Sequence, residues 1–290
     1  MSKRTIEAVF APPAPHMVGD GFRVHHFFPD GVIADKQRMS PFFMLDYASP
    51  FHFTPTQTPR GVGVHPHRGF ETVTIAYQGK IAHHDSAGHH GIIQAGDVQW
   101  MTAGAGVLHK EYHDKEFAEQ GGLFQMVQLW VNLPMAYKMT PPCYQELTAA
   151  SMTRVPIEDG EVEIIAGEYQ GKKGPAHTFS PLNVFNLHLQ EKGRCILHFP
   201  AHFNTALLVI KGSLLVNEQT AAANQFVLLK NDGEKIEVHA LEQSIVLVLS
   251  GEPLGEPISA YGPFVMNSWK EIEQAVLDFN EGKFGVLSDN

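Results

Sequence analysis

Cysteine is scarce in this sequence. The 290 residues contain two, Cys143 and Cys195, and neither belongs to a C-x-x-C pair. Two cysteines cannot crosslink a chain of this length into a disulfide framework, and C-x-x-C pairs are what zinc ribbons and thioredoxin-like redox sites use. The sequence therefore excludes a disulfide-stapled scaffold, and we expect a reducing compartment, the cytoplasm.

Long hydrophobic runs are also missing. The first ten residues include Lys3, Arg4 and Glu7 and hold no apolar stretch of the kind that a secretory signal requires. Apolar runs such as 245–249 are far too short to cross a bilayer. We therefore expect neither a signal peptide nor a membrane segment.

Basic residues are outnumbered. The 21 Lys and Arg stand against 31 Asp and Glu, so the formal net charge is −10, and no basic run is longer than a pair such as Lys172-Lys173. Proteins that bind nucleic acids directly usually concentrate positive charge on one surface. This composition argues against a direct nucleic-acid partner.

What the sequence has is a series of short β-type segments. Apolar residues make up 43% of the chain, which is ample material for a core. Segments with apolar alternation or β-branched runs are separated by glycine turns, which is typical of an all-β sandwich or barrel. These segments are 72–77, 91–94, 98–101 and 124–131 in the first half, and 162–167, 184–189, 206–216, 226–229, 235–239 and 244–249 in the second.

The two β-rich halves resemble each other, and a helical tail follows them. The run from Ile75 through Gly79 and the run from Val209 through Gly212 both indicate strand, glycine turn and strand, so we expect two β-barrels of one type. A proline-rich stretch at 132–142 separates them. The predicted domains are residues 1–133, 134–250 and 251–290.

The tail carries the pattern of one amphipathic helix. Ser268 and Glu271 form a capping box, and Gly282 lies where a helix end is expected. The apolar residues between them recur at helical spacing. They are Ile272, Ala275, Val276 and Phe279.

Two short histidine motifs indicate a metal site. His65 and His67 are two residues apart, as are His109 and Glu111, and residues two apart in a strand share a face. If the two segments lie side by side, three imidazoles and one carboxylate converge, a set that suits a first-row transition metal. In a chain with 17 histidines such pairs also arise by chance, so spacing alone leaves both readings open.

Long motifs around these residues resemble the signature of the pirin family, a group of proteins with two cupin domains. The resemblance is strongest in the first half and covers most of the chain. The stretches that carry it are 61–73, 96–111, 251–257 and 261–267.

The resemblance implies two cupin β-barrels with a C-terminal segment that returns to the N-terminal barrel, and a second barrel without metal. It implies one iron per chain, most simply Fe(II), with His65, His67, His109 and Glu111 as ligands. It also implies one of two functions. The first is a dioxygenase that cleaves flavonols such as quercetin with O2, in which Glu111 could act as the base. The second is an iron-dependent, redox-responsive regulator that binds a protein partner, either a transcription factor or a metabolic enzyme.

Several other residues allow more than one interpretation. Glu71 occupies the position of the carboxylate ligand in the wider cupin pattern, so it is the alternative to Glu111 or a residue that orients a ligand. We expect His83, His84, His89 and His90 in a solvated hairpin loop, His113 exposed, and no second metal among the histidines of the second half. Some large side chains could line a pocket, although core packing is the usual role of such residues. They are Phe70, Trp100, Met101 and Phe124.

Overall fold

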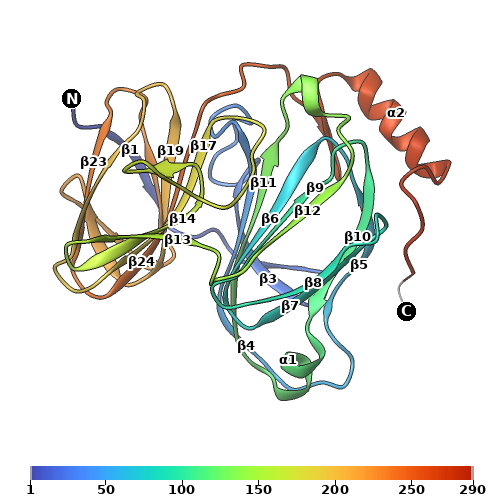
Figure 1. Ribbon diagram of the computed structural model, residues 1–290, viewed down its shortest axis with the longest axis horizontal. Coiled ribbons are helices and arrows are strands. Elements are labelled where there is room, and N and C mark those ends of the chain that lie inside the picture. The colour runs from blue at the N-terminus through green and yellow to red at the C-terminus, as the bar shows by residue number, and fades with distance from the viewer. Residues whose placement is uncertain (1, 289–290) are drawn as a thin grey trace. The chain divides into compact units, whose positions relative to one another are not determined.

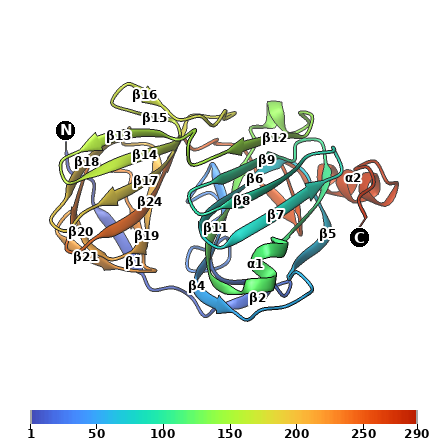
Figure 2. The ribbon, with the colours of Figure 1, turned by 60° about the horizontal axis from the view of Figure 1, so that its bottom comes forward.

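The computed structural model describes residues 2–288 and has two compact units. The first barrel comprises residues 14–37, 42–149 and 255–290, and the second barrel comprises residues 1–13, 38–41 and 150–254. The all-β prediction is confirmed, because strands dominate both units and the helices are few and short. Figure 1 and Figure 2 show the strands of each barrel.

The first barrel consists of two antiparallel sheets and short additional elements. The seven-stranded sheet has the order β12 (Cys143–Leu147), β9 (Val98–Thr102), β6 (Phe70–Gln78), β11 (Gly122–Asn132), β4 (Phe42–Phe53), β3 (Phe22–Phe28) and β2 (His16–Val18). The four-stranded sheet has the order β5 (Gly61–His67), β10 (Val107–His113), β7 (Lys80–Asp85) and β8 (His90–Gln94). The remaining elements are α1 (Lys115–Gln120), η1 (Met135–Tyr137), β25 (Ser259–Tyr261), β26 (Phe264–Met266) and α2 (Trp269–Asn280).

The second barrel repeats this architecture. Its seven-stranded sheet has the order β1 (Ile6–Phe10), β22 (Phe226–Leu229), β19 (Asn204–Lys211), β24 (Ser244–Gly251), β17 (Leu182–Leu189), β14 (Gly160–Ala166) and β13 (Thr153–Ile157). Its four-stranded sheet has the order β18 (Arg194–His198), β23 (Lys235–Ala240), β20 (Ser213–Val216) and β21 (Gln219–Ala222). A small hairpin is formed by β15 (Glu168–Tyr169) and β16 (Lys172–Lys173).

The repeated strand order supports the predicted duplication. Apart from the edge strands β12 and β1, the strands at equivalent positions of the two pairs of sheets are thirteen strands apart from β4 onward, and β2 and β3 match β13 and β14, which precede the hairpin of β15 and β16. Gly79 joins β6 to β7 and Gly212 joins β19 to β20, both with positive φ (88° and 83°). A Cβ at Gly79 would lie 2.7 Å from Phe124 and one at Gly212 would lie 2.4 Å from Ser244, so both turns need glycine.

The unit boundaries differ from the domain boundaries expected from the sequence. Residues 1–13 belong to the second barrel because β1 pairs with β22, with Phe10 opposite Phe226. Residues 134–149 belong to the first barrel because β12 pairs with β9. The segment 255–290 packs with the first barrel.

The predicted tail helix is confirmed as α2. The Ser268 side chain accepts a hydrogen bond from the Glu271 backbone N–H, and the Glu271 carboxylate accepts from Ser268 Oγ at 2.8 Å. Ile272 and Ala275 are buried, as the periodicity predicts, whereas Phe279 is 38% exposed. Figure 1 shows α2 on the outside of the first barrel, near β5 and β10.

A buried ion pair connects α2 to the strand that carries two histidines. Arg68 directly follows β5, and its Nη1 lies 2.8 Å from Asp278 Oδ2. The Arg68 guanidinium also donates from Nε to the Ala105 carbonyl at 2.6 Å and lies 4.6 Å from the Phe284 ring centroid. Arg68, the residue next to His67, is therefore positioned by an ion pair, a hydrogen bond and a cation–π contact.

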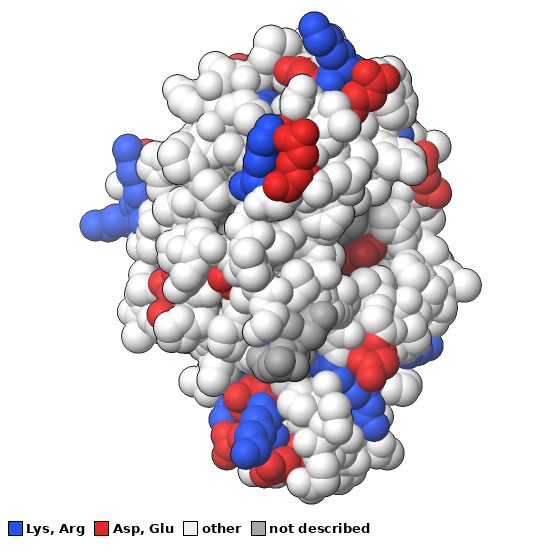
Figure 3. Space-filling model, turned by 90° about the vertical axis from the view of Figure 1, so that its right-hand side faces the viewer, with Lys and Arg blue, Asp and Glu red and all other residues white. Residues whose placement is uncertain are grey.

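The surface agrees with the charge composition. On the face shown in Figure 3, Lys and Arg stand in small groups beside Asp and Glu, and no broad basic area is seen. In the described part of the chain, no helix is both long enough and apolar enough to cross a membrane.

Candidate metal centre

The three predicted histidine ligands come together between the two sheets of the first barrel. Antiparallel pairing of β5 and β10 places His109 directly opposite His65. Nε2 of His109 lies 2.9 Å from Nε2 of His65, and one ring nitrogen from each of His65, His67 and His109 falls within a 4.8 Å cluster. His67 and His109 are buried, and His65 is partly exposed.

A β-bulge in β5 determines which way these side chains point. His109 pairs with His65, but Glu111, two residues on, pairs with Val62, three residues back. The extra residue of β5 reverses the alternation between Val62 and His65. As a result Val62, His65 and His67 all face the same cavity, although the first two are an odd number of residues apart.

The contacts of the two Nδ1 atoms bear on the tautomers of the two facing rings. Nδ1 of His65 donates to the Gly63 carbonyl at 2.8 Å, which leaves the lone pair on Nε2. Nδ1 of His109 lies 3.4 Å from Nδ1 of His83, which already accepts from Gln99 Nε2 at 3.1 Å. In the neutral tautomer of His109 that carries its proton on Nδ1, toward His83, the lone pair is on Nε2.

Two lone pairs thus face each other at 2.9 Å, an arrangement that fits a bound cation. Imidazole nitrogens bind transition metals at about 2.0–2.1 Å, so two adjacent ligands of one ion have this separation. The buried Nδ1 of His67 has no hydrogen-bond partner. Burial, followed by the nearby histidines, holds the pKa of His67 and of His109 well below the ordinary value, which keeps both rings neutral and able to ligate.

The Glu111 carboxylate is held beside this cluster by three side chains of the opposite sheet. Oε1 accepts from Thr74 Oγ1 at 3.0 Å and from Gln99 Nε2 at 3.4 Å, and Oε2 accepts from Gln128 Nε2 at 3.4 Å. Glu111 falls in a second group of potential ligands, with His83 and His109. The two groups share His109, and among residues 2–288 no group contains Glu111 together with His65 and His67, although these three residues line one cavity.

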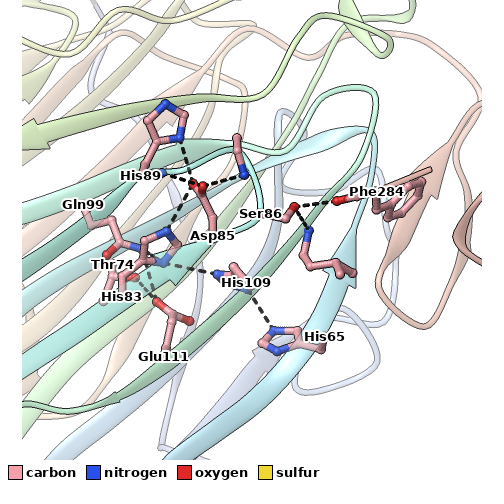
Figure 4. A network of polar contacts seen from close by, with 12 residues as sticks. His65, Thr74, His83, Asp85, Ser86, His89, Gln99, His109, Glu111 and Phe284 are labelled. Atoms are coloured by element: carbon pink, nitrogen blue, oxygen red, sulfur yellow. Dashed lines mark hydrogen bonds and ion pairs between the residues drawn. The ribbon is translucent and has the colours of Figure 1, made fainter. Parts of the chain in front are cut away.

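His83 corrects the prediction of a solvated loop. The turn after β7 does form a hairpin with β8, and His90 is exposed, but His83 is completely buried. Its Nε2 lies 3.5 Å from Asp85 Oδ2, which lies 2.9 Å from Nδ1 of the partly exposed His89. Figure 4 shows this network running from His65 and His109 through His83 to Asp85 and His89.

The predictions for the other histidines have mixed outcomes. His113 is buried rather than exposed, because β10 continues through it: its Nε2 donates to the Gly21 carbonyl at 2.8 Å and its ring packs 4.6 Å from Phe53. In the second barrel, the inward positions of the strands are filled by aliphatic residues such as Leu197, Val238 and Val216. Among residues 2–288, both groups of potential metal ligands lie in the first barrel.

Glu71 lies apart from the cluster. It is the cross-strand neighbour of Thr102, whose Oγ1 donates to its carboxylate at 2.8 Å. Thr74, three residues later on β6, faces Glu111, so Glu71 points to the other face of that sheet. The strands β5 and β6 belong to different sheets, and the break between them at Arg68 and Gly69 separates Glu71 from the face that carries His65 and His67. Burial raises the pKa of Glu71 to about 7.

A cavity of about 450 Å³ opens at the histidines. His65, His67, Glu111 and Gln128 form its polar end, and Asp46 is a further polar group. The rest of the wall is mainly apolar and comes from both sheets and the C-terminal segment. These lining residues are Val18, Phe22, Val24, Met44, Val62, Met126, Trp130, Gly262 and Pro263.

Trp130 and Phe22 are aromatic residues of the cavity wall that sequence reasoning missed, and Trp130 is the one beside the histidines. It lies 5.2 Å from the His67 ring and stacks on Phe70 at 4.2 Å between ring centroids. Phe70, which packs 5.0 Å from His67, supports the cavity wall from behind. The alternation of 124–131 contains the signal, because Met126, Gln128 and Trp130 share the face that lines the cavity.

The other three candidates for a pocket lining are core residues. Phe124 packs in the aromatic cluster with Phe22 and Phe117. Met101 packs with Val107. Trp100 is fully buried and, as the neighbour of Gln99 on β9, points to the opposite face of the sheet.

Both barrels match known protein families. Residues 21–131 match the family Pirin, and residues 184–285 match the Pirin C-terminal cupin domain. A protein of Pseudomonas aeruginosa is 50% identical over 93% of this chain and 94% of its own length. Its name gives quercetin 2,3-dioxygenase as a provisional activity. Pirin-like protein 2 of Arabidopsis thaliana is 37% identical over 98% of this chain and 86% of its own.

A solved structure has the same architecture throughout. The crystal structure of quercetin 2,3-dioxygenase from Acinetobacter baumannii aligns with a TM-score of 0.93 and 47% identity. The alignment covers 99% of this chain and 100% of that chain. The fold with two cupin domains therefore extends over essentially the whole chain.

Proposed function

The chain belongs to the pirin family, and from that premise we propose that it is a metal-dependent dioxygenase that cleaves flavonols such as quercetin with O2. One transition metal per chain, iron in the ferrous state, would be held by His65, His67, His109 and Glu111. The observation that carries the proposal is that the Nε2 atoms of His65 and His109 lie 2.9 Å apart at the end of a cavity. The names of the relatives support the substrate class.

The metal would supply a Lewis acid for the substrate oxygens and the redox chemistry that O2 requires. Three histidines and one carboxylate leave coordination positions for other ligands on an iron ion. The buried, neutral imidazoles suit a divalent ion, and the carboxylate reduces the net charge of the site. These donors are the mixture of nitrogen and oxygen atoms that first-row metals accept.

Glu111 would accept the proton of the flavonol hydroxyl as the substrate binds. Its carboxylate lines the cavity, and the hydrogen bonds from Thr74 and Gln128 keep it aimed. Met126 and Trp130 would flank the flat rings and exclude water, which favours oxygen attack on the ring over side reactions. The substrate would take up both atoms of O2 and lose one ring carbon as CO.

The test is an aerobic assay of the purified protein with quercetin, together with metal analysis. We expect O2 and quercetin to be consumed in equal amounts with release of CO. Chelation should stop the reaction, and ferrous iron should restore it. The absence of metal-dependent oxygen uptake with any flavonol would refute the proposal and favour an iron-dependent regulator that binds a protein partner. The cytoplasmic location expected from the two free cysteines stays a prediction.

A further inference from the structure

A second carboxylate lines the cavity, away from the histidines. Asp46 on β4 is buried, 8% exposed, and contributes to the cavity wall among apolar side chains such as Val24 and Met44. A carboxylate in an apolar wall is costly unless it is paired or binds a ligand. None of the metal-ligand groups in residues 2–288 includes Asp46.

His26 neutralises Asp46 from behind. Its Nδ1 lies 2.6 Å from Asp46 Oδ1, and its Nε2 contacts the Pro29 carbonyl. Both ring nitrogens face acceptors, an arrangement that favours the protonated imidazolium form of His26. The hydrogen bond to Asp46 accordingly raises the pKa of His26. This ion pair uses Oδ1 and leaves Oδ2 without a hydrogen bond in the described part of the chain.

The register of the sheet relates Asp46 to the residues that hold Glu111. Asp46 pairs with Gln128 on β11, and Gln128 pairs with Thr74 on β6, which donates to Glu111. These residues form one row on the inner face of the sheet. Neighbouring strands lie about 4.8 Å apart, so two strand spacings put Asp46 about 10 Å from Thr74.

The space between these polar ends has apolar sides. Met44 and Trp130 face each other across β4 and β11, one pair along from Asp46 and Gln128, and Met126 lies on the other side of Gln128. A ligand that reaches from the histidines to Asp46 must therefore be apolar along its faces and polar at both ends.

We propose that Asp46 is a specificity-determining residue that accepts a hydrogen bond from a phenolic hydroxyl group at the end of the substrate remote from the metal. The inference rests on the proposed function and narrows its substrate class to flavonols with hydroxyl groups on the rings remote from the metal-binding oxygens. A neutral hydroxyl fits better than an amine, because His26 already balances the charge of Asp46. Oδ2 is the accepting atom.

The test compares two flavonols that share one ring system. Quercetin carries ring hydroxyl groups in addition to the metal-binding pair of oxygens, and 3-hydroxyflavone carries the metal-binding pair alone. Binding to the metal-loaded protein is measured by fluorescence titration, and KM and kcat are measured in parallel. A hydrogen bond to a charged group corresponds to about tenfold or more in affinity, so wild type should bind quercetin more tightly by that factor.

Two variants and one control decide the outcome. Asp46→Ala should weaken quercetin binding at least about tenfold and leave 3-hydroxyflavone unchanged, with the loss in KM rather than kcat. Asp46→Asn, which has nearly the same shape, should shift selectivity in the same direction and serves if the alanine variant does not fold. Glu119→Gln removes an exposed charge outside the cavity and should change neither ligand.

The contrary outcomes are distinct. Equal loss of both flavonols in both variants would assign Asp46 a structural role, and unchanged selectivity, or a wild type that binds neither flavonol, would overturn the inference. Selective binding without CO release would retain Asp46 as the specificity residue and refute the dioxygenase proposal instead.

Discussion

The Nε2 atoms of His65 and His109 face each other 2.9 Å apart, and in the neutral tautomers with the proton on Nδ1 each carries a lone pair. Two such atoms repel unless a cation lies between them, so this pair defines the metal centre more sharply than the count of histidines does. The arrangement depends on the register of β5 and β10 and on the bulge that precedes His65. Both are properties of the backbone pairing of these two strands.

The first prediction concerns stoichiometry. The purified protein should hold one transition metal per chain, and His109→Ala should reduce the content to less than about a tenth, because the shared ligand of both groups is lost. Elemental analysis measures the content, and circular dichroism should show the β-sheet spectrum retained. Two tightly bound metals per chain in wild type, or full occupancy in the variant, would disprove the assignment.

The second prediction separates the two glutamates. Glu111→Gln should lower metal affinity at least about tenfold and abolish turnover, because it removes the ligand charge and the base together. Glu71→Gln should leave both nearly unchanged, since Glu71 lies on the other face of its sheet. Titration against a competing chelator provides the affinities. Greater damage from Glu71→Gln would make Glu71 the ligand.

The third prediction follows from the pKa of Glu71, which burial raises to about 7 in the folded protein. Between the ordinary value and about 7 the folded state binds more protons than the unfolded state, so Glu71 lowers stability as the pH rises through that window. A shift of this size corresponds to about 3 kcal/mol at most. Glu71→Gln should therefore gain unfolding free energy relative to wild type between pH 5 and about pH 7.

Denaturant unfolding of the metal-free protein at a series of pH values measures this difference. Wild type and variant should be closest at low pH, where Glu71 is protonated in both states. The difference should then grow and level off above about pH 7. A difference that is independent of pH would show that Glu71 titrates in the folded state as it does in the unfolded chain.

The fourth prediction concerns the network behind the ligands. Asp85 positions His83, which receives the hydrogen bond from His109, so Asp85→Asn should lower metal affinity about tenfold without emptying the site. The spectrum of the ferric form should shift as the ligand field changes. His90→Ala, a change at an exposed residue of the same hairpin, is the matched control. Wild-type affinity and spectrum in Asp85→Asn would show that the network does not orient His109.

Sequence reasoning succeeded where the chemistry depends on local periodicity. The two-residue spacing of His65 and His67 placed both on one face of β5, and the similar glycine turns at Gly79 and Gly212 indicated the duplication that the strand order bears out. The capping residues of α2 could also be recognised in the sequence, because helix ends depend on contacts between neighbours in the sequence.

It failed where the deciding contact is remote or irregular. His83 stands in a run rich in histidine and small residues that resembles an exposed loop, yet the strand β7 extends to Asp85 and buries it. Nothing in the sequence of 1–13 shows that β1 pairs with a strand more than two hundred residues away. The face of Glu71 depends on the break between two sheets at Arg68 and Gly69; the sequence allows an irregularity there but does not determine which sheet each strand joins.

The measurement that tests the central claim most directly is turnover of quercetin under isotopically labelled O2, with mass analysis of the product and detection of CO. The account predicts that both labelled oxygen atoms enter the same product molecule, that CO is released in equal amount, and that His109→Ala protein yields neither. Product that carries no label, or equal product from His109→Ala protein, would contradict a dioxygenase built on this metal centre.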